Sequence, residues 1–263
     1  MERTLTSRAI TSLNNPAVKA ARALHLRKER EESGLFLAEG LKIITEAVEL
    51  GREPRLLLHS AEAAGHPLLG SAAAVARETV EVTPAILAKI SRRDNPQTVL
   101  GIFEQAFTPL DALEPTSARC WVALQAVRDP GNLGTILRTA DAAGCGGVIL
   151  VGDCCDPYSV EAVRATMGSI FAVSIARTSV EGFTAWRRTW PGSVVGTLLT
   201  ATTDFRTADY RAPALILMGN EQSGLPPKLA EICDTVVKIP MRGRADSLNL
   251  AVATGVMIYA ATG

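Results

Sequence analysis

The sequence predicts an α/β protein of two domains, the second built on a mostly parallel sheet with helices on both faces. After about residue 119, nearly continuous apolar stretches of strand length alternate with helical segments, the pattern of buried parallel strands. Before it, residues 109–118 carry two prolines and no sustained period. The 263 residues, 47% of them apolar, suffice for one large or two ordinary domains. We predict a first domain over residues 1–108, a linker over 109–118 and a second domain over 119–263.

The first domain is predicted to be a smaller α/β unit. Apolar residues near helical spacing predict a helix over residues 16–32, which Gly34 ends. Thr83 and Pro84 form an N-cap and a first helical position, predicting a short helix to residue 91. The other predicted elements are strands at residues 35–39, 55–60 and 98–105 and a helix at 41–51.

The second domain shows a more regular alternation. Strands are predicted at residues 120–127, 146–152, 171–176, 193–199, 213–220 and 235–240. Helices are predicted at residues 134–143, 159–167, 180–188 and 227–232, with a final helix rich in small residues that begins at Ser247. Ligands of parallel α/β sheets lie outside the carboxyl ends of the strands. The loops after Val127, Leu199, Gly219 and Pro240 are therefore the candidates for a binding site.

The charge distribution gives no global sign of a polyanionic partner, because 27 Lys and Arg balance 27 Asp and Glu. Residues 1–30 nevertheless carry seven Lys and Arg against two Glu. Such a cluster is usually a solvated helix face, and it is also what a phosphate-facing surface requires. Composition alone leaves both readings open.

Cysteine and histidine usage argues against metal and disulfide chemistry. The five cysteines are odd in number and contain no C-x-x-C pair, so we expect reduced thiols and a cytoplasmic location. The three histidines lack metal-ligand spacing among themselves or with the cysteines, so no metal is expected. No apolar run approaches the ~20 residues of a membrane span, and the N-terminus does not read as a signal peptide.

The first candidate loop is "RDPGNLGTILRTADAAG", residues 128–144. Its glycines expose backbone N–H groups at a helix N-terminus, where anions and polar ligand groups bind readily. Arg138 is predicted on the first turns of that helix, facing the same loop. A tight turn with a surface arginine explains the local sequence about as well. The spacing is G-x-x-G, so it is no dinucleotide fingerprint.

Two further loops complete the set. "LILMGNEQSGLP", residues 215–226, ends a buried strand with two glycines that allow close backbone approach, while Asn220 and Glu221 offer polar side chains. "IPMRGRADSLN", residues 239–249, joins the last strand to the final helix, where Ser247 is expected as the N-cap. Three such loops at the strand ends of one sheet indicate a binding site more strongly than any one alone.

These motifs together resemble the SpoU-TrmH family of RNA ribose 2′-O-methyltransferases, in the superfamily of knotted SPOUT methyltransferases. The matching stretches are "NLGTILRTADAAG", "LMGNEQSGL" and "IPMRGRADSLNLAVA", in that order. The pattern "LRKEREESGLFLAEGLKIITEA", residues 26–47, is similar to the ribosomal-protein-like RNA-binding domain of members that act on ribosomal RNA. "SLNLAVA" departs from many members at Leu250 and Ala251, which affects packing more than chemistry.

The resemblance implies a C-terminal trefoil knot, which general rules of chain topology do not predict. It implies S-adenosylmethionine as cofactor and a homodimer through the C-terminal knot region, with the active site near the interface. The implied cofactor-binding residues are Gly219, Ile239, Leu248, Thr197, Leu198, Asn220 and Met241. The implied catalytic residues are Arg138, Asn132, Glu221, Ser247 and Asn249. Under this reading the basic residues expected at RNA phosphates are Arg22, Arg27, Lys28, Arg30, Arg92 and Arg93.

The expected activity is methylation of a ribose 2′-hydroxyl in RNA, with 23S-type ribosomal RNA favoured by the first domain. Within the same chemistry, a transfer-RNA methyltransferase or an antibiotic-resistance methylase of ribosomal RNA stays open. A non-catalytic RNA-binding assembly factor is the alternative of another class. An arginine side chain stays protonated in proteins, so Arg138 is interpreted as a clamp for phosphate and growing negative charge rather than as a literal base.

Overall fold

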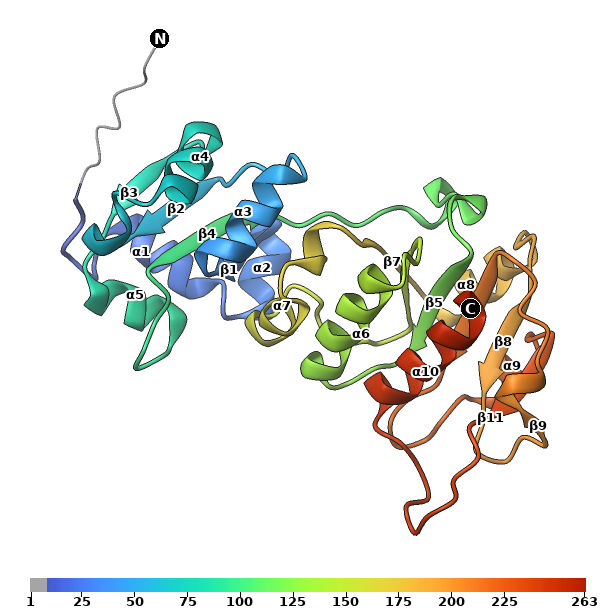
Figure 1. Ribbon diagram of the computed structural model, residues 1–263. Coiled ribbons are helices and arrows are strands. Elements are labelled where there is room, and N and C mark those ends of the chain that lie inside the picture. The colour runs from blue at the N-terminus through green and yellow to red at the C-terminus, as the bar shows by residue number, and fades with distance from the viewer. Residues whose placement is uncertain (1–8) are drawn as a thin grey trace. The chain divides into compact units, whose positions relative to one another are not determined.

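The computed structural model describes residues 9–263, which form two compact units (Figure 1). Arg3 and Arg8 of the basic N-terminal stretch lie outside the described residues. The first unit contains the chain up to Gln105 together with Tyr158–Ala172, and the second contains Ala106–Pro157 and Val173–Gly263. Residues 158–172 therefore belong with the first unit, although they lie inside the predicted second domain. The division into independently folding domains at residues 1–108 and 119–263 stays a prediction.

The first unit is an α/β fold on a four-stranded sheet of order β1-β4-β2-β3. The β2–β3 pair is parallel, while β4 runs antiparallel to both β1 and β2. Its strands are β1 (Leu35–Glu39), β2 (Leu56–His59), β3 (Thr79–Glu81) and β4 (Val99–Glu104). Its helices are α1 (Pro16–Ala23), α2 (Arg27–Ser33), α3 (Leu41–Glu49), α4 (Pro67–Val75), α5 (Pro84–Ser91) and α7 (Val160–Thr166), with 3₁₀ turns η1 (Ala61–Ala63) and η4 (Ser169–Phe171).

The structure corrects one prediction in this unit and adds two elements that were not predicted. The single helix over residues 16–32 is wrong, because a break at residues 24–26 divides it into α1 and α2. Asn15 caps α1 by accepting a hydrogen bond from the N–H of Ala17, and Gly34 ends α2 in the left-handed region at φ 67°. Helix α4 and strand β3 were not predicted. Helix α4 is apolar or small along most of its length, so it lacks the amphipathic stripe that marks a helix.

Aromatic packing explains why residues 158–172 join the first unit. Phe36 of β1 lies with its ring centroid 4.7 Å from that of Tyr158 and 5.6 Å from that of Phe171. Side chains alternate along a strand, so the neighbouring Leu37 faces the opposite core with Val18 and other apolar residues. Burial of large aromatic rings is among the strongest apolar contributions to packing. Helix α7 is thereby held against β1.

The second unit is built on a seven-stranded sheet of order β7-β6-β5-β10-β8-β11-β9 in which every neighbouring pair is parallel. This confirms the predicted mostly parallel α/β sheet. Its strands are β5 (Cys120–Gln125), β6 (Gly147–Val151), β7 (Ser174–Thr178), β8 (Val194–Thr197), β9 (Thr203–Asp204), β10 (Ala214–Met218) and β11 (Thr235–Lys238). Its helices are α6 (Pro130–Ala142), α8 (Val180–Arg187), α9 (Pro227–Ala230) and α10 (Leu250–Thr262), with 3₁₀ turns η2 (Leu110–Ala112), η3 (Pro115–Ser117) and η5 (Phe205–Thr207).

Helices cover both faces of this sheet (Figure 1). Phe183 of α8 and Leu229 of α9 share one apolar core with Leu215 and Leu217 of β10. Helices α6 and α10 lie side by side, and α10 packs against β10 and β5. Because strands β5, β10, β8 and β11 are adjacent and parallel, their carboxyl ends lie along one edge. The loops predicted to carry the site therefore meet there.

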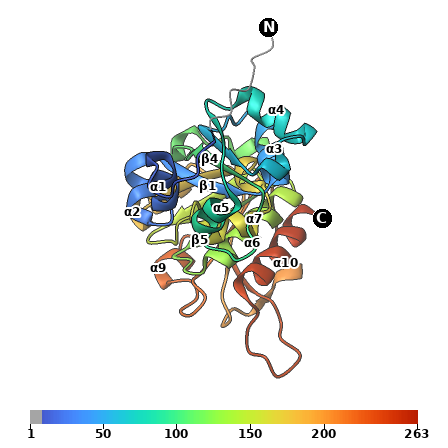
Figure 2. The ribbon, with the colours of Figure 1, turned by 90° about the vertical axis from the view of Figure 1, so that its left-hand side faces the viewer.

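Both functional helices begin elsewhere than predicted. Helix α6 begins at Pro130, with Asp129 as its N-cap, rather than at Gly134. Helix α10 begins at Leu250 with Asn249 as its N-cap, so the assignment of that role to Ser247 is wrong. Residues 239–249 instead form an extended loop that projects away from the sheet in both views (Figure 2). The trefoil knot stays a prediction.

Candidate active site at the carboxyl ends of the parallel strands

A cavity of about 810 Å³ opens at the carboxyl ends of β8, β10 and β11; we call it the strand-end cavity. Pockets of roughly 300–1,000 Å³ are typical of small-molecule sites. Its lining brings together eleven of the twelve residues predicted to be catalytic or to bind cofactor: Asn132, Thr197, Leu198, Gly219, Asn220, Glu221, Ile239, Met241, Ser247, Leu248 and Asn249. The sequence motifs therefore identified most of one real cavity, while the role of each residue stays a prediction.

The loop after β10 is a closed turn that requires its first glycine. A Cβ atom on Gly219 would lie 2.1 Å from the backbone nitrogen of Leu225. Asn220 and Gly224 exchange backbone hydrogen bonds of 3.1 and 2.9 Å, and the Asn220 side chain accepts from the N–H of Gln222. Gly219 is thus explained by the contact of this loop with itself. Closing the loop presents Glu221 to the neighbouring loop after β5.

Glu221 is the centre of the polar contacts at this edge. One carboxylate oxygen accepts from the backbone N–H of Arg128 at 3.3 Å, and the other from that of Asp129 at 3.4 Å. The side-chain amides of Asn132 and Asn220 also donate to this carboxylate, at 3.4 and 3.3 Å. A carboxylate at the N-terminus of α6 is favoured by the helix dipole. Glu221 therefore fixes the start of α6 relative to the β10 loop.

Two asparagines connect the starts of the two helices. Asn249 donates a 2.9 Å hydrogen bond to the side-chain oxygen of Asn132. The oxygen of Asn249 meanwhile accepts from the N–H groups of Ala251 and Val252, as an N-cap does. Asn132 in turn contacts Glu221. The three predicted polar residues thus form one chain of hydrogen bonds across three loops.

A smaller cavity of about 430 Å³ adjoins the first and shares Asn132, Glu221, Gln222 and Asn249 with it. Arg128 and Asp129 complete its lining. The Arg128 guanidinium donates a 2.6 Å hydrogen bond to Asp153. Sequence reasoning did not assign Arg128 or Asp129 a role. An aspartate before a proline marks the start of a helix. Recognising Asp129 and Pro130 in this way would have placed Arg128 and Asp129 at the helix start, next to the site.

Arg138 is the predicted catalytic residue that the structure does not bring to the strand-end cavity. It does not line that cavity, and its side chain is exposed on α6. Because α6 begins at Pro130, Arg138 lies six residues beyond Asn132, about 9 Å along the helix axis at 1.5 Å per residue. The expectation that it faces the loop from the first turns is therefore wrong.

Two helical neighbours of Arg138 line another hollow. Residues three and four apart share one side of a helix, so Arg138 lies beside Thr135. Thr135 and Thr139 line a mainly apolar hollow of about 490 Å³ between α6 and α10, the α6–α10 groove. Its other lining residues are Ala251, Val252, Gly255, Val256 and Tyr259. Val252 and Tyr259 are 55% and 59% exposed and lie together in this groove, so they form an exposed apolar patch.

The six predicted RNA-contacting residues are not equivalent. Arg30 is 3% exposed and donates a 2.7 Å hydrogen bond to the carbonyl of Leu24, so it is a buried structural residue rather than part of an exposed surface. Arg27 and Lys28 are exposed and form i,i+4 ion pairs with Glu31 and Glu32. Three exposed arginines remain from the set: Arg22, Arg92 and Arg93.

His25 lies beside this basic region, and burial is the first cause that lowers its pKa below 6.5. The positive charges of Arg92 and Arg164 lower it further, while Glu161 and the hydrogen bond to Ile90 oppose the shift. The neutral ring is therefore the form that the fold prefers.

We expect the stability of the protein to fall with acidification through this histidine. Its contribution is present above about pH 6.5, where the unfolded residue is neutral, and is lost as the pH falls through the lower pKa of the folded state. Chemical denaturation at several pH values should show a smaller decrease for His25→Gln than for the wild type. Equal slopes for the two proteins would contradict this prediction.

The adjacent Cys154 and Cys155 do not form a reactive pair. None of the five is in a disulfide. Burial raises the pKa of Cys154, and raises that of Cys155 to about 12, so both are thiols near neutral pH. Among residues 9–263, no group of three or more His, Cys, Asp or Glu side chains is placed to hold a metal ion. No helix within the same residues is long and apolar enough to cross a membrane.

Comparison with known proteins relates both units to RNA-modifying enzymes. The MRM3-like substrate binding domain matches residues 15–101. A 23S rRNA (uridine(2479)-2′-O)-methyltransferase of Streptomyces viridochromogenes is 32% identical over 99% of this chain and 93% of its own length. The 23S rRNA (guanosine(2553)-2′-O)-methyltransferase RlmP of Bacillus subtilis is 28% identical over 95% and 97% of the two chains.

Solved structures agree with this relationship. A crystal structure of an AdoMet-bound rRNA methyltransferase from Sinorhizobium meliloti superposes with a TM-score of 0.91 at 48% identity, covering 97% of each chain. The SpoU rRNA Methylase family matches residues 119–259, the part of the chain that holds the strand-end cavity and the Glu221 contacts. The chain therefore belongs to the SpoU rRNA methylase family.

Proposed function

We propose that this protein transfers a methyl group from S-adenosylmethionine to a ribose 2′-hydroxyl in RNA, with 23S-type ribosomal RNA as substrate. The observation that carries the proposal is the strand-end cavity whose three loops are tied together through Glu221, Asn132 and Asn249. Membership of the family and the named activities of its relatives support the same chemistry.

The residues of the strand-end cavity suit S-adenosylmethionine. Leu198, Ile239 and Leu248 provide apolar surface, and the loop after β10 provides backbone groups beside it. An adenine ring held in an apolar slot by main-chain groups needs this combination. We assign the seven predicted cofactor residues to this role: Gly219, Ile239, Leu248, Thr197, Leu198, Asn220 and Met241. The cofactor supplies an electrophilic methyl group on a sulfonium sulfur.

The polar edge of the cavity suits the acceptor nucleotide. A ribose hydroxyl is a weak nucleophile, so the site must hold the 2′ oxygen in line and assist loss of its proton. Asn132, Ser247 and Asn249 line this edge, and Glu221 holds Asn132, which in turn accepts from Asn249. Arg138 is assigned to hold a phosphate of the target nucleotide and to stabilise negative charge on the ribose oxygen.

A homodimer through α6 and α10 reconciles this role with the position of Arg138. The exposed apolar residues of the α6–α10 groove are an unpartnered surface on the C-terminal helix. In a two-fold dimer the same patch serves both chains. Arg138 lies beside Thr135 and Thr139, which line this groove, and it does not line the cavity of its own chain. We therefore assign Arg138 to the active site of the second chain.

Val252→Asp tests the dimer. An aspartate at this 55% exposed apolar position would place a charge in the interface, which is costly when unpaired. We expect a shift from dimer to monomer in analytical ultracentrifugation and loss of most methyl transfer, with cofactor binding retained. The matched control is Val75→Asp, an exposed valine on α4 of the first unit. A fully dimeric Val252→Asp protein would contradict the assignment.

Replacement of Arg22 and Arg92 tests the RNA surface of the first unit. Each phosphate contact releases counterions, so losing one reduces the slope of log K against log salt by about 0.7–0.9. We expect Arg22→Ala and Arg92→Ala to weaken RNA binding and flatten this slope while leaving cofactor affinity unchanged. Arg55→Ala, an exposed arginine paired with Glu104, is the control. Unchanged salt slopes would remove this surface from the RNA interface.

The decisive experiment for the activity is incubation of the protein with unmodified ribosomal RNA, transfer RNA and labelled S-adenosylmethionine. Mapping of ribose methylation then distinguishes a ribosomal target, including a drug site, from a transfer-RNA target. Transfer to neither RNA, with cofactor binding in calorimetry, would favour the non-catalytic assembly factor instead. Because ribosomal RNA is the proposed substrate and the five cysteines are unpaired, we assign the protein to the cytoplasm.

A further inference from the structure

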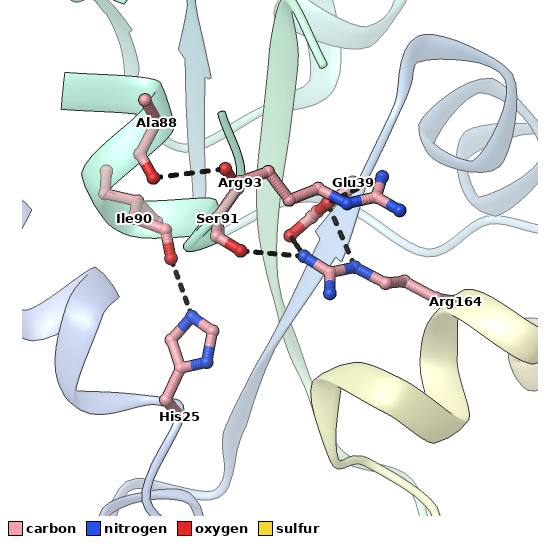
Figure 3. A network of polar contacts seen from close by, with 7 residues as sticks. All are labelled: His25, Glu39, Ala88, Ile90, Ser91, Arg93 and Arg164. Carbon is pink, nitrogen blue, oxygen red and sulfur yellow. Dashed lines mark hydrogen bonds and ion pairs between the residues drawn. The ribbon is translucent and has the colours of Figure 1, made fainter. Parts of the chain in front are cut away.

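Glu39, at the end of β1, is a buried carboxylate whose side chain is only 2% exposed. Arg164 of α7 binds it with both arms of its guanidinium group: Nε donates to Oε2 at 3.1 Å, and Nη2 donates to Oε1 (Figure 3). Two parallel hydrogen bonds of this kind are the strongest arrangement between an arginine and a carboxylate. The charge of Glu39 is therefore already balanced by Arg164.

A second arginine lies close to the same carboxylate. Arg93 Nη1 is 3.9 Å from Glu39 Oε2, a distance too long for a direct hydrogen bond, and its side chain is 46% exposed (Figure 3). Glu39 thus has one tightly bound arginine and one loosely associated one. Because Arg93 is too far from Glu39 for a direct hydrogen bond and is partly exposed, its donors can reach a partner in solution.

Arg164 and His25 also secure the base of the segment that carries Arg93. Arg164 Nη2 donates a 2.8 Å hydrogen bond to the carbonyl of Ser91, the last residue of α5. His25 Nε2 lies 2.6 Å from the carbonyl oxygen of Ile90, which can only accept. Arg92 then turns the chain in the left-handed region at φ 55°. Two side chains from different elements therefore fix the point from which Arg92 and Arg93 extend.

Helix α7 comes from a part of the sequence far from the rest of the first unit. It lies between β6 and β7 in the sequence, yet belongs with the first unit. The segment just before it holds Asp153, which binds the Arg128 side chain at 2.6 Å, and the backbone of Arg128 donates to Glu221. The helix that pairs with Glu39 is thus continuous with a segment that supports the proposed active site.

We propose that Arg164 is a positioning residue for RNA binding: by neutralising Glu39 it leaves Arg93 free to bind an RNA phosphate. Without Arg164 the buried carboxylate would recruit Arg93, the other arginine paired with it among residues 9–263, because a buried charge is strongly disfavoured unless paired. Arg93 would then be withdrawn from the surface. The inference rests on the proposed RNA-binding role of the first unit and adds the device that keeps its arginine available.

The test compares four variants by RNA affinity, salt slope and the KM for RNA. Arg93→Ala measures the direct contribution of Arg93. Arg164→Gln should weaken RNA binding about as much, roughly three- to tenfold at moderate salt, and lower the salt slope by about one contact. Glu39→Gln with Arg164→Gln removes the competition, so it should restore affinity to within about twofold of wild type. In each case kcat at saturating RNA and cofactor affinity should stay near wild type.

Arg55→Gln is the matched control. Glu104 also has two arginine partners, Arg55 at 3.1 Å and Arg77 at 3.4 Å, but all three side chains are exposed. This variant should leave RNA binding unchanged. Removing one partner of a buried ion pair also destabilises the fold, and removing both relieves that cost. Thermal melting of each variant therefore gives the folded fraction at the assay temperature, and RNA affinities are compared for folded protein only.

The outcomes are distinguishable. If Arg93→Ala leaves RNA binding unchanged, the RNA surface itself is wrong and this inference falls with it. If Arg93→Ala weakens binding but Arg164→Gln does not, only the positioning role is overturned. A double variant that binds RNA as weakly as Arg164→Gln would likewise overturn it, since the loss would then come from the missing Arg164 and not from recruitment of Arg93.

Discussion

Replacing Arg138 with alanine is expected to lower kcat by about 10²–10³, the range for removing one group that stabilises charge in a transition state. Arg138→Lys keeps the charge but loses the planar fork, so an intermediate loss of about tenfold is expected. Cofactor affinity should not change in either variant, because Arg138 is assigned to the RNA phosphate and the ribose oxygen and not to the cofactor. Single-turnover methyl transfer and calorimetry with S-adenosylmethionine measure the two quantities separately.

The pH dependence of the rate distinguishes a charge clamp from a base. A clamp that stays positive throughout the accessible range lowers the whole profile without changing its shape when it is removed. If Arg138 were a literal base, its removal would abolish the limb of the pH–rate profile that reports its ionisation. A lysine variant with near-normal rate would show that the guanidinium fork is not needed, and an altered limb in Arg138→Ala would favour the base.

The strand-end loops were predictable because they depend on local sequence signals. Gly219 is required by a closed turn, and the apolar runs before each loop mark buried parallel strands. The position of a residue along its helix was harder to predict from the sequence than the strand-end loops. Missing the start of α6 at Pro130 moved Arg138 to the wrong part of the helix. Asp129, just before Pro130, is an N-cap signal that would have given the correct start of α6.

Features that depend on contacts between distant segments could not be predicted. The order β10-β8-β11 places strands side by side that a sequence pattern does not pair. Arg30 resembles its exposed basic neighbours in sequence, yet it is buried, and its backbone carbonyl accepts a hydrogen bond from the side chain of Gln105, 75 residues away. Helix α7 joins the first unit through Tyr158 and Arg164, whose partners Phe36 and Glu39 lie more than a hundred residues away in the chain.

Glu221→Gln is expected to lower kcat/KM by about 10²-fold with a smaller loss of stability. Its carboxylate accepts from two backbone N–H groups and two side-chain amides. Glutamine has one acceptor oxygen, and its amide would place donors against donors, so the start of α6 and Asn132 would move. Glu221 is exposed, which limits the cost to the fold. Wild-type kinetics in this variant would show that the polar contacts are dispensable.

Mixing the Glu221→Gln and Arg138→Ala proteins tests where the two residues act. If Arg138 serves the cavity of the second chain, a mixed dimer has one site with both Glu221 and Arg138 intact. Random exchange then restores about a quarter of wild-type activity, since half of the dimers are mixed and each has one complete site. If both residues act within one chain, every site lacks one of them and mixing restores nothing. Recovery of activity would therefore support both the dimer and the shared site, and its absence would confine Arg138 to its own chain.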